Sequence, residues 1–431
     1  MIMTTIRLTS SELGIFEVPD KNLIGVFSSS CSTKDLSDEE ISNKFDSPIN
    51  LSPIRDLARG KKQVLLVCDD NTRPTPISRL LPFVIDELSK ANIEDRRIKI
   101  LIGLGTHRPM DSNEIIKKFG KDISERYEII NHTWDDDKQL VRLESTGNGF
   151  EIIINRLVLE SDFIVSMGNI IPHATAGFSG GGKTIMPGVC GNATIADTHW
   201  KALEYPMKEI LGVLNNPVRL SIRNVCRKIE LNCIVDSVIA GGKLVDIVVG
   251  EGETAHAIGA RKSREIYGVE IREKADIVVA EAFPMDIDLR QAIKAICSAD
   301  VIVRGGGVII LAAGCPEGIS PQFPDFEKYG FSNPEWLYRE VEEGRFDNKL
   351  LAYTLVAIGR IISEGVKCIL VSPNIDKERK ESMGFIHAED LSMAMECAFK
   401  IAGRSARTAI LKNAGELLPI LVEDRYAEKA S

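Results

Sequence analysis

The sequence predicts an α/β protein with two domains, each built on a mainly parallel sheet flanked by helices. Two observations carry this prediction. Short apolar runs alternate with longer amphipathic segments, and 431 residues exceed what one ordinary core encloses. We expect an N-terminal α/β domain over residues 1–270, a C-terminal α/β domain over 271–431, and an active site in the cleft between the two domains.

Each element follows from the local pattern. In the first domain, apolar runs predict strands at 63–69, 97–105, 162–169 and 231–240, and amphipathic segments predict helices at 76–91, from about Asp111, and at 252–267. The second domain repeats this alternation, with strands at 275–283, 306–313 and 366–372 and helices at 288–299, 333–343 and 349–363. Sites of α/β proteins gather at the carboxyl ends of such strands, so the loops after them are candidates for function.

Composition excludes several classes of partner. A net charge of −9 argues against a nucleic acid or an anionic membrane. No apolar run reaches the roughly 18–20 residues of a membrane span, and the N-terminus lacks the pattern of a signal peptide. The nine cysteines form no C-x-x-C pair and several fall in apolar runs, which indicates buried, reduced thiols. We therefore expect a cytoplasmic protein.

One glycine-rich segment raises a choice between two chemistries. Residues 177–184, GFSGGGKT, match the phosphate-loop pattern G-x-x-x-x-G-K-[ST]. A phosphate loop needs a strand directly before its first glycine and a helix that opens at its lysine, whereas Pro187 follows Thr184 closely and disfavours a helix. The alternative is a lysine amine, Lys183, presented by small residues as a nucleophile. A solvated lysine in a surface turn is the simplest reading of the loop alone.

Three of the six histidines lie near these strand-terminal motifs. His107 follows a turn after the second predicted strand, and His173 and His199 flank Lys183 in sequence. Histidine at such positions suits proton transfer or metal binding, while local hydrogen bonding is the structural alternative. His132 is expected to be structural. No H-E-x-x-H motif or cysteine cluster is present, so a metal would need one histidine together with an organic cofactor.

Polar residues also follow the first predicted strand. The segment DDNTRP supplies Asp70, Thr72 and Arg73. Thr72 and Arg73 suit a phosphate or carboxylate, and Asp70 suits a ribose hydroxyl. A capped turn into the helix at 76–91 is the alternative reading.

A second cationic motif lies in the C-terminal half. In DLRQAIKA, Arg290 and Lys294 are four residues apart on one face of the predicted helix, with Gln291 three residues before Lys294. This face suits a small carboxylate, and a solvated helix face is the alternative.

Together these motifs resemble the nickel-dependent lactate racemase family, also called the LarA-like or nickel-pincer family. The resemblance covers nearly the whole chain and depends on DDNTRPTP, GTHRPM, PHATAGFSGGGKTIMPG and the Q-x-x-K of RQAIK. The spacing from His173 to Lys183 to His199 is its most specific part.

The resemblance implies a cofactor and a role for each motif. The cofactor is a nickel-pincer nucleotide, pyridinium-3,5-bisthiocarboxylic acid mononucleotide nickel, attached covalently through Lys183. His199 is implied to bind the metal, and His107 and His173 to be the two acid/base groups. Asp70, Thr72 and Arg73 are implied to lie near the cofactor, Arg73 also near the substrate, and Arg290, Gln291 and Lys294 to contact the substrate.

The implied reaction inverts C2 of a 2-hydroxy acid by hydride transfer to and from that cofactor. One departure concerns the substrate: the family pattern has a tyrosine immediately before the Gln of Q-x-x-K, where this chain has Arg290. An added guanidinium suits a second carboxylate or a polyhydroxy chain. We therefore expect a larger or more polar 2-hydroxy acid than lactate, such as malate, 2-hydroxyglutarate or an aldonate.

Other interpretations stay open at this point. These are lactate as the substrate, a non-catalytic cofactor-binding homologue, and a P-loop-like nucleotide-binding protein. A nicotinamide-dependent dehydrogenase is disfavoured because GLGTHR is not G-x-G-x-x-G. The expected partners are a small 2-hydroxy acid and the proteins that make the cofactor, with homo-oligomerisation left open.

Overall fold

The computed structural model describes residues 2–30, 34–143 and 151–422, and its contacts divide the chain into two compact units. The N-unit comprises Ser30–Ala202 and Gly212–Ile266. The C-unit comprises the chain up to Ser29, Leu203–Leu211, and the chain from Tyr267 onward. The sequence-based division at residue 270 did not assign the first 29 residues to the C-terminal half. Their place in the C-unit depends on a strand pairing over nearly 400 residues, which no local pattern signals.

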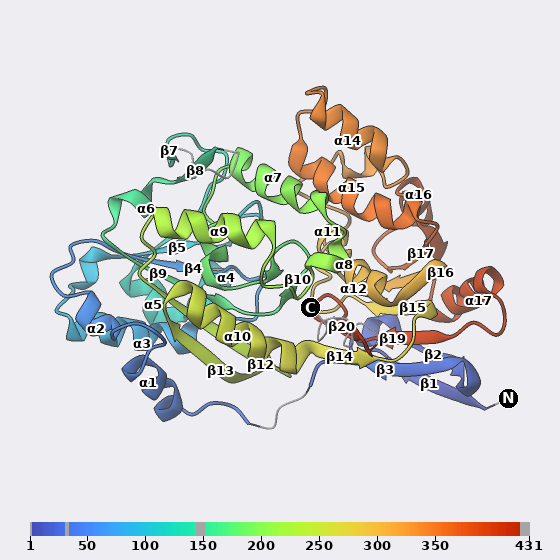
Figure 1. Cartoon of the computed structure of the whole chain (residues 1–431), viewed down its shortest axis with the longest axis horizontal. Helices are drawn as coiled ribbons and strands as arrows, with labels where there is room; N and C mark the ends of the chain where they lie inside the picture. The colour runs from blue at the N-terminus through green and yellow to red at the C-terminus, as the bar shows by residue number, and fades with distance from the viewer. Residues whose placement is uncertain (1, 31–33, 144–150, 423–431) are drawn as a thin grey trace, which may run out of the picture. The chain divides into compact units, whose positions relative to one another are not determined.

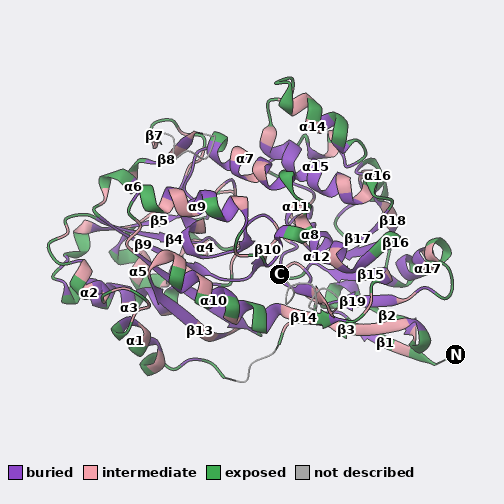
Figure 2. Ribbon diagram, in the orientation of Figure 1, coloured by how far each residue is buried: buried purple, intermediate pink, exposed green. Residues whose placement is uncertain are grey.

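The N-unit is built on a six-stranded sheet in the order β13-β12-β9-β4-β5-β6. Its strands are β4 (Val64–Cys68), β5 (Ile98–Ile102), β6 (Glu128–Asn131), β9 (Phe163–Asn169), β12 (Cys233–Ala240) and β13 (Lys243–Gly250). Neighbouring strands are parallel except β13, which pairs antiparallel with β12. The central strands β4 and β9 are buried along their whole length (Figure 2), as expected for parallel strands covered on both faces.

Helices pack against this sheet (Figure 1). The N-unit helices are α1 (Asp38–Asp46), α2 (Ile54–Leu57), α3 (Ile77–Lys90), α4 (Ser112–Phe119), α5 (Lys121–Arg126), α6 (Arg156–Glu160), α7 (Asn192–Lys201), α9 (Pro217–Lys228) and α10 (Gly252–Tyr267). One core cluster joins Ile41 of α1 and Leu80 of α3 to alternate residues of the strands, including Leu66. Two short antiparallel pairs complete the unit: β7 (Leu140–Leu143) with β8 (Ile152–Asn155), and β10 (Pro172–His173) with β11 (Gly177–Phe178).

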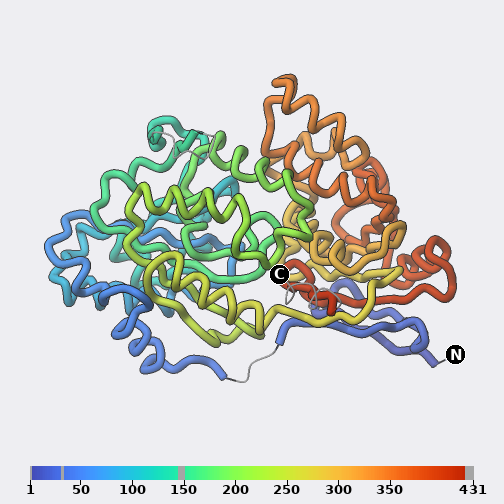
Figure 3. The backbone as a smooth tube through the Cα atoms, in the orientation of Figure 1, coloured from blue at the N-terminus to red at the C-terminus, as the bar shows by residue number. Residues whose placement is uncertain are grey.

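The C-unit contains an entirely parallel six-stranded sheet in the order β18-β17-β16-β15-β19-β3. Its strands are β3 (Leu23–Phe27), β15 (Ala275–Glu281), β16 (Val303–Ala312), β17 (Lys367–Val371), β18 (Ile386–Ala388) and β19 (Thr408–Leu411). Two further pairs are β1 (Met3–Arg7) with β2 (Ile15–Pro19), antiparallel, and β14 (Gly268–Ile271) with β20 (Leu418–Leu421), parallel. Figure 3 shows the blue N-terminal segment beside the red C-terminal one in this unit, where β3 pairs with β19.

The C-unit helices are α8 (Met207–Ile210), α11 (Leu289–Ala292), α12 (Lys294–Ile302), α13 (Phe326–Tyr329), α14 (Pro334–Glu342), α15 (Lys349–Ser363), α16 (Lys377–Ser382) and α17 (Leu391–Ala402). The predicted strands and helices are confirmed with ends shifted by a few residues, with one exception. The helix expected over 288–299 is interrupted at Ile293, which caps α11 and precedes α12.

Two expectations from composition concern cysteines and membranes. All eight cysteines within the described ranges are free, and six of them are buried. Cys31 lies outside the described residues. Within the same ranges, none of the helices combines the length and the apolar character that crossing a membrane requires.

Candidate active site

The motifs of the N-unit follow three neighbouring strands. β4, β5 and β9 are parallel, and they end at Cys68, Ile102 and Asn169. The segments after them carry DDNTRP, GTHRP and the glycine-rich loop. Because the carboxyl ends of neighbouring parallel strands meet at one edge of a sheet, these loops lie together. The backbone also joins them: Gly103 donates to the Cys68 carbonyl at 2.7 Å, and Gly105 donates to the Gly188 carbonyl at 2.8 Å.

At this edge a carboxylate orients a histidine. The Nδ1 of His107 lies 2.6 Å from Oδ2 of Asp70, and Oδ1 of Asp70 accepts from the amide and the hydroxyl of Thr72 at 3.1 and 2.6 Å. Burial alone would raise the pKa of Asp70, but the His107 ring and the nearby Arg73 hold that pKa well below its usual range. An ionised Asp70 accepts the hydrogen of His107 Nδ1, so in the neutral ring the lone pair is on Nε2.

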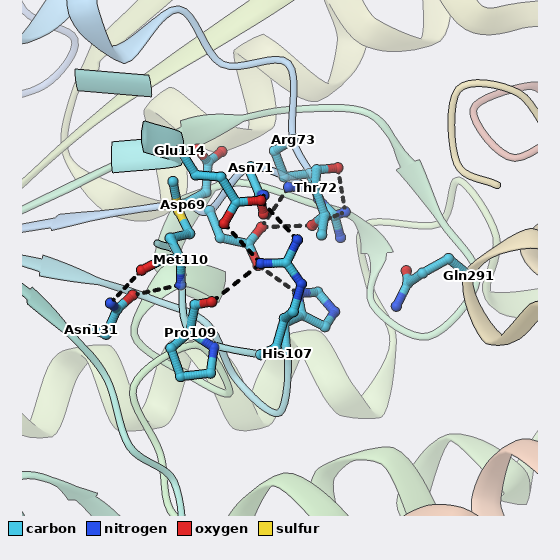
Figure 4. Close-up of polar contacts among 12 residues, drawn as sticks. Asp69, Asn71, Thr72, Arg73, His107, Pro109, Met110, Glu114, Asn131 and Gln291 are labelled. Atoms are coloured by element: carbon cyan, nitrogen blue, oxygen red, sulfur yellow. Dashed lines mark hydrogen bonds and ion pairs between the residues drawn. The ribbon is translucent and has the colours of Figure 1, made fainter. Parts of the chain in front are cut away.

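The residues of the DDNTRP turn are joined by hydrogen bonds and by an ion pair. Arg73 donates to the carbonyl and the hydroxyl of Thr72, both at 3.2 Å (Figure 4). Lys118 of α4 pairs with Asp69 at 2.9 Å and donates to the Arg73 carbonyl at 2.8 Å. Helix α3 begins after Pro76 without any side-chain cap, so the polar residues of the turn do not cap it as the alternative reading required.

His173 has the opposite hydrogen-bonding pattern to His107. It ends the short strand β10, and its Nδ1 accepts from the backbone amides of Thr175 and Ala176 at 3.1 and 3.3 Å. The neutral ring therefore has its hydrogen on Nε2. For Nε2 to become a proton acceptor, hydrogen must move to Nδ1, which displaces these amides unless the ring turns over.

Lys183 lies in a tight 3₁₀ turn, η4 (Gly181–Thr184). Burial lowers the pKa of Lys183 from 10.5 to about 7, with Arg73 and Arg219 adding to the effect and Asp70 opposing it. Within the described residues its Nζ has no hydrogen bond or ion pair. A partly buried amine with a lowered pKa is a nucleophile at neutral pH. η4 ends at Thr184 and the next helix, α7, begins only at Asn192, so the helix that a phosphate loop needs is absent at Lys183.

His199 lies in α7 and is oriented by its own helix. Its Nδ1 donates to the carbonyl of Ile195 at 2.7 Å, so in the neutral ring Nε2 is the nitrogen that can bind a metal. In the ranges that the structure describes, no group of three or more His, Cys, Asp or Glu side chains could hold a metal ion. A metal on His199 would therefore take its other ligands from a bound group.

The three cationic-motif residues belong to the C-unit. Lys294 Nζ donates to Oε1 of Gln291, and Asp288 caps α11 by accepting from the Gln291 amide at 2.7 Å. Arg290 lies over the ring of Phe323, 4.6 Å from its centroid. Burial lowers the pKa of Arg290, and Asp288 and Tyr353 oppose that effect. Gln291 and Lys294 are thus in contact, whereas Arg290 packs on an aromatic ring.

Some buried polar residues near the loop were not predicted. Ser166, Arg219 and Asp236 bond to the backbone of the glycine-rich loop. A lone carboxylate inside the apolar strand LNCIVDSVIA was a usable signal for Asp236. His132 is structural, as predicted: it bonds to the Cys190 carbonyl at 2.9 Å and to Asn155 at 3.2 Å, and burial lowers its pKa to about 4.

Comparisons with known proteins identify the family of this chain. Residues 10–210 match the Lactate racemase N-terminal domain family, and residues 271–416 match the Lactate racemase C-terminal domain family. The lactate racemase of Thermoanaerobacterium thermosaccharolyticum is 30% identical over 404 residues, which are 92% of this chain and 94% of that protein. The lactate racemase of Lactiplantibacillus plantarum is 28% identical over 403 residues, with the same coverage of 92% and 94%.

Two solved structures are similar to this chain over most of its length. The lactate racemase apoprotein of Thermoanaerobacterium thermosaccharolyticum matches with a TM-score of 0.85 at 29% identity, covering 94% of this chain and 97% of that chain. A protein from Thermotoga maritima matches with a TM-score of 0.72 at 19% identity, over 91% of this chain and 100% of that chain, and shares the fold. Because the two domain families match in order over most of the sequence, this chain belongs to the lactate racemase family, a family of isomerases.

Proposed function

We propose that this chain racemises or epimerises C2 of a small 2-hydroxy acid, with a nickel-pincer nucleotide attached covalently through Lys183. One observation carries the proposal: the Asp70 carboxylate bonds to His107 and lies near enough to Lys183 to oppose the lowering of its pKa, so an oriented histidine and an amine with a pKa of about 7 lie around one carboxylate.

The surroundings of two residues fit the cofactor. The Lys183 amine has a pKa lowered to about 7 and follows three consecutive glycines, which suits covalent attachment to an acyl carbon. His199 presents Nε2, and the described residues contain no group of three or more His, Cys, Asp or Glu side chains that could hold a metal ion by themselves. Imidazole and sulfur ligands suit nickel. When bound, such a cofactor supplies an acceptor and donor of hydride, which no protein side chain offers.

The side chains supply the proton chemistry. In one direction His107 takes the proton of the substrate hydroxyl at Nε2, and Asp70 stabilises the imidazolium that forms. His173 is the second acid/base group and serves the opposite face. Its Nδ1 is held by two amides, so its proton exchange at Nε2 requires a local rearrangement of residues 175–176 or a turn of the ring.

The substrate is proposed to be larger or more polar than lactate. Gln291 and Lys294, which are in contact, are proposed to bind the C1 carboxylate. Arg290 is proposed to recognise a second carboxylate or a hydroxyl chain, and its stacking on Phe323 limits where that guanidinium can reach. Lactate agrees equally well with membership of the family and is the alternative substrate.

The deciding experiment is the intact mass and nickel content of the chain co-produced with the proteins that make the cofactor. We expect an adduct and nickel on the wild type and on Lys121→Ala, an exposed control, and neither on Lys183→Ala. The loaded enzyme is then assayed by chiral chromatography with lactate, malate, 2-hydroxyglutarate and aldonates. An unmodified, nickel-free wild type from a host proven to make the cofactor refutes the proposal. A loaded protein that turns over none of these acids indicates a non-catalytic homologue.

A further inference from the structure

The backbone around Lys183 is held by polar side chains from three elements. Ser166 of β9 donates to the Gly181 carbonyl at 2.8 Å, and Asp236 of β12 accepts from the Gly181 amide at 2.5 Å. Arg219 of α9 donates to the Gly180 carbonyl at 3.2 Å and to the Phe178 carbonyl. These three side chains, the loop clamp, therefore hold the 180–181 and 181–182 peptide groups, which lie just before Lys183.

The clamp residues are costly to bury. Ser166 and Asp236 are fully buried and Arg219 is 2% exposed. Within the described residues Arg219 Nε has no hydrogen-bond partner, and the hydrogen bonds of the guanidinium go to the Gly180 and Phe178 carbonyls of the loop. Burial lowers the pKa of Arg219 to about 10 and raises the pKa of Asp236 to about 7. Removing charged groups from water in this way lowers the stability of the folded protein. Such groups are therefore expected where they fix a specific arrangement.

The loop has no side chains of its own at Gly180, Gly181 and Gly182. Gly180 and Gly181 have φ of 71° and 62°, and a Cβ on Gly182 would lie 2.0 Å from Cys226 Sγ. A cavity of about 100 Å³ lies beside the loop, lined by Gly182, Arg219, Cys226 and His256 among others. Because these three positions offer no side chains for packing, the hydrogen bonds to the backbone contribute much of what fixes the position of the turn.

We propose that Ser166, Arg219 and Asp236 are positioning residues that hold the Lys183 amine in its partly buried, reactive setting before the cofactor arrives. The role of Lys183 in attachment rests on the proposed function, whereas the clamp acts on the amine of the bare protein. Loosening the clamp lets the amine reach water and behave as an ordinary, mostly protonated lysine at pH 7.

The test measures amine reactivity in the full-length protein without cofactor or substrate. A limiting amount of acetic anhydride is added at pH 7, and peptide mass spectrometry gives the ratio of acetylation at Lys183 to that at the exposed Lys121. Ser166→Ala removes the clamp bond to Gly181, together with a hydroxyl–hydroxyl contact with Thr184, without changing charge. Ser237→Ala is the matched control, because this buried hydroxyl on β12 donates to the Gly168 carbonyl at 3.2 Å and not to the loop.

Ser166→Ala is expected to lower the ratio roughly fivefold, the effect of one net hydrogen bond, and Ser237→Ala to leave it unchanged. Asp236→Val is expected to lower the acetylation ratio further. Asp236→Asn keeps an acceptor oxygen for the Gly181 amide and is expected to have a ratio close to that of the wild type. Only variants with the circular dichroism spectrum of the wild type are compared. If Asp236→Val misfolds, the test depends on Ser166→Ala and Asp236→Asn.

An unchanged ratio in folded Ser166→Ala, or equal losses in the Ser237 control, overturns the clamp. Neither result bears on whether the loaded wild type carries the cofactor, which is measured separately by intact mass. Conversely, a clamp effect on acetylation with no cofactor adduct from a competent host refutes the proposed function and leaves the clamp standing.

Discussion

Asp70 and His107 come from the ends of adjacent strands and meet at 2.6 Å, with the carboxylate on the Nδ1 side of the ring. This contact sets the tautomer, because an ionised Asp70 keeps hydrogen on Nδ1 and the lone pair on Nε2. The same carboxylate raises the pKa of Lys183 against the effect of burial. One buried charge thus influences both the proposed base and the proposed attachment point.

We expect Asp70→Asn to lower kcat for racemisation by about 10²–10⁴-fold with little change in KM, since the amide offers His107 a competing donor and cannot stabilise its imidazolium. The rate is measured by chiral chromatography of the loaded enzyme. Asp122→Asn, on α5, is the control and should keep wild-type activity. If Asp70→Asn raises KM with kcat unchanged, Asp70 acts in binding and not through His107.

The Lys183 amine should titrate near neutrality. Its acetylation rate is expected to be half-maximal near pH 7, where an ordinary lysine is half-maximal near 10.5. Arg73 and Arg219 lower this pKa and Asp70 raises it, so Arg73→Met should move the midpoint upward and Asp70→Asn downward. Rates at Lys183 and at Lys121 are followed by peptide mass spectrometry between pH 5.5 and pH 10. Coincident profiles for the two lysines would contradict the buried, activated amine.

The sequence predicted the elements better than their long-range partners. The run QVLLVCD predicted β4 within one residue, because a buried parallel strand is apolar throughout. The pairing of β3 with β19 was not predicted, since β3 carries no signal of which sheet it joins. The helix over 288–299 was predicted as continuous because its residues favour helix, and the break at Ile293 reflects tertiary context.

For the site, residue types were predictable and hydrogen-bonding states were not. His107 and His173 were both predicted as acid/base groups, a role that remains a prediction. Their opposite patterns depend on Asp70 in one case and on the amides of Thr175 and Ala176 in the other. Such partners are set by loop geometry, which the spacing of motifs in a sequence does not define.

Acid should destabilise the N-unit partly through His132. The folded pKa of this buried ring is about 4 and its ordinary value is 6.5, so the unfolded chain binds more protons between these pH values. The neutral His132 ring therefore makes its full contribution to the free energy of unfolding above pH 6.5. This contribution, about 3 kcal/mol at most, is lost as the pH falls toward 4. Urea unfolding of the wild type and His132→Gln across pH 4–7.5 checks this, and the variant should have the flatter profile. Parallel profiles would show that other groups cause the acid sensitivity.

Substrate choice gives a prediction that depends on a single side chain. Arg290 lies on the Phe323 ring and stands where the family pattern has tyrosine. Arg290→Tyr removes the guanidinium, so kcat/KM for a dicarboxylic or polyhydroxy 2-hydroxy acid should fall about 10–100-fold, the effect of one charge-assisted hydrogen bond, while that for lactate holds or rises. Arg290→Lys keeps the charge but cannot form a bidentate contact, so its kcat/KM for the dicarboxylic or polyhydroxy acid should lie between those of the wild type and Arg290→Tyr. Both variants are assayed with lactate and malate in the same loaded preparation, with Arg304→Lys as an exposed control. If the ratio of the two substrates stays the same in Arg290→Tyr, Arg290 serves packing against Phe323 and selection lies elsewhere.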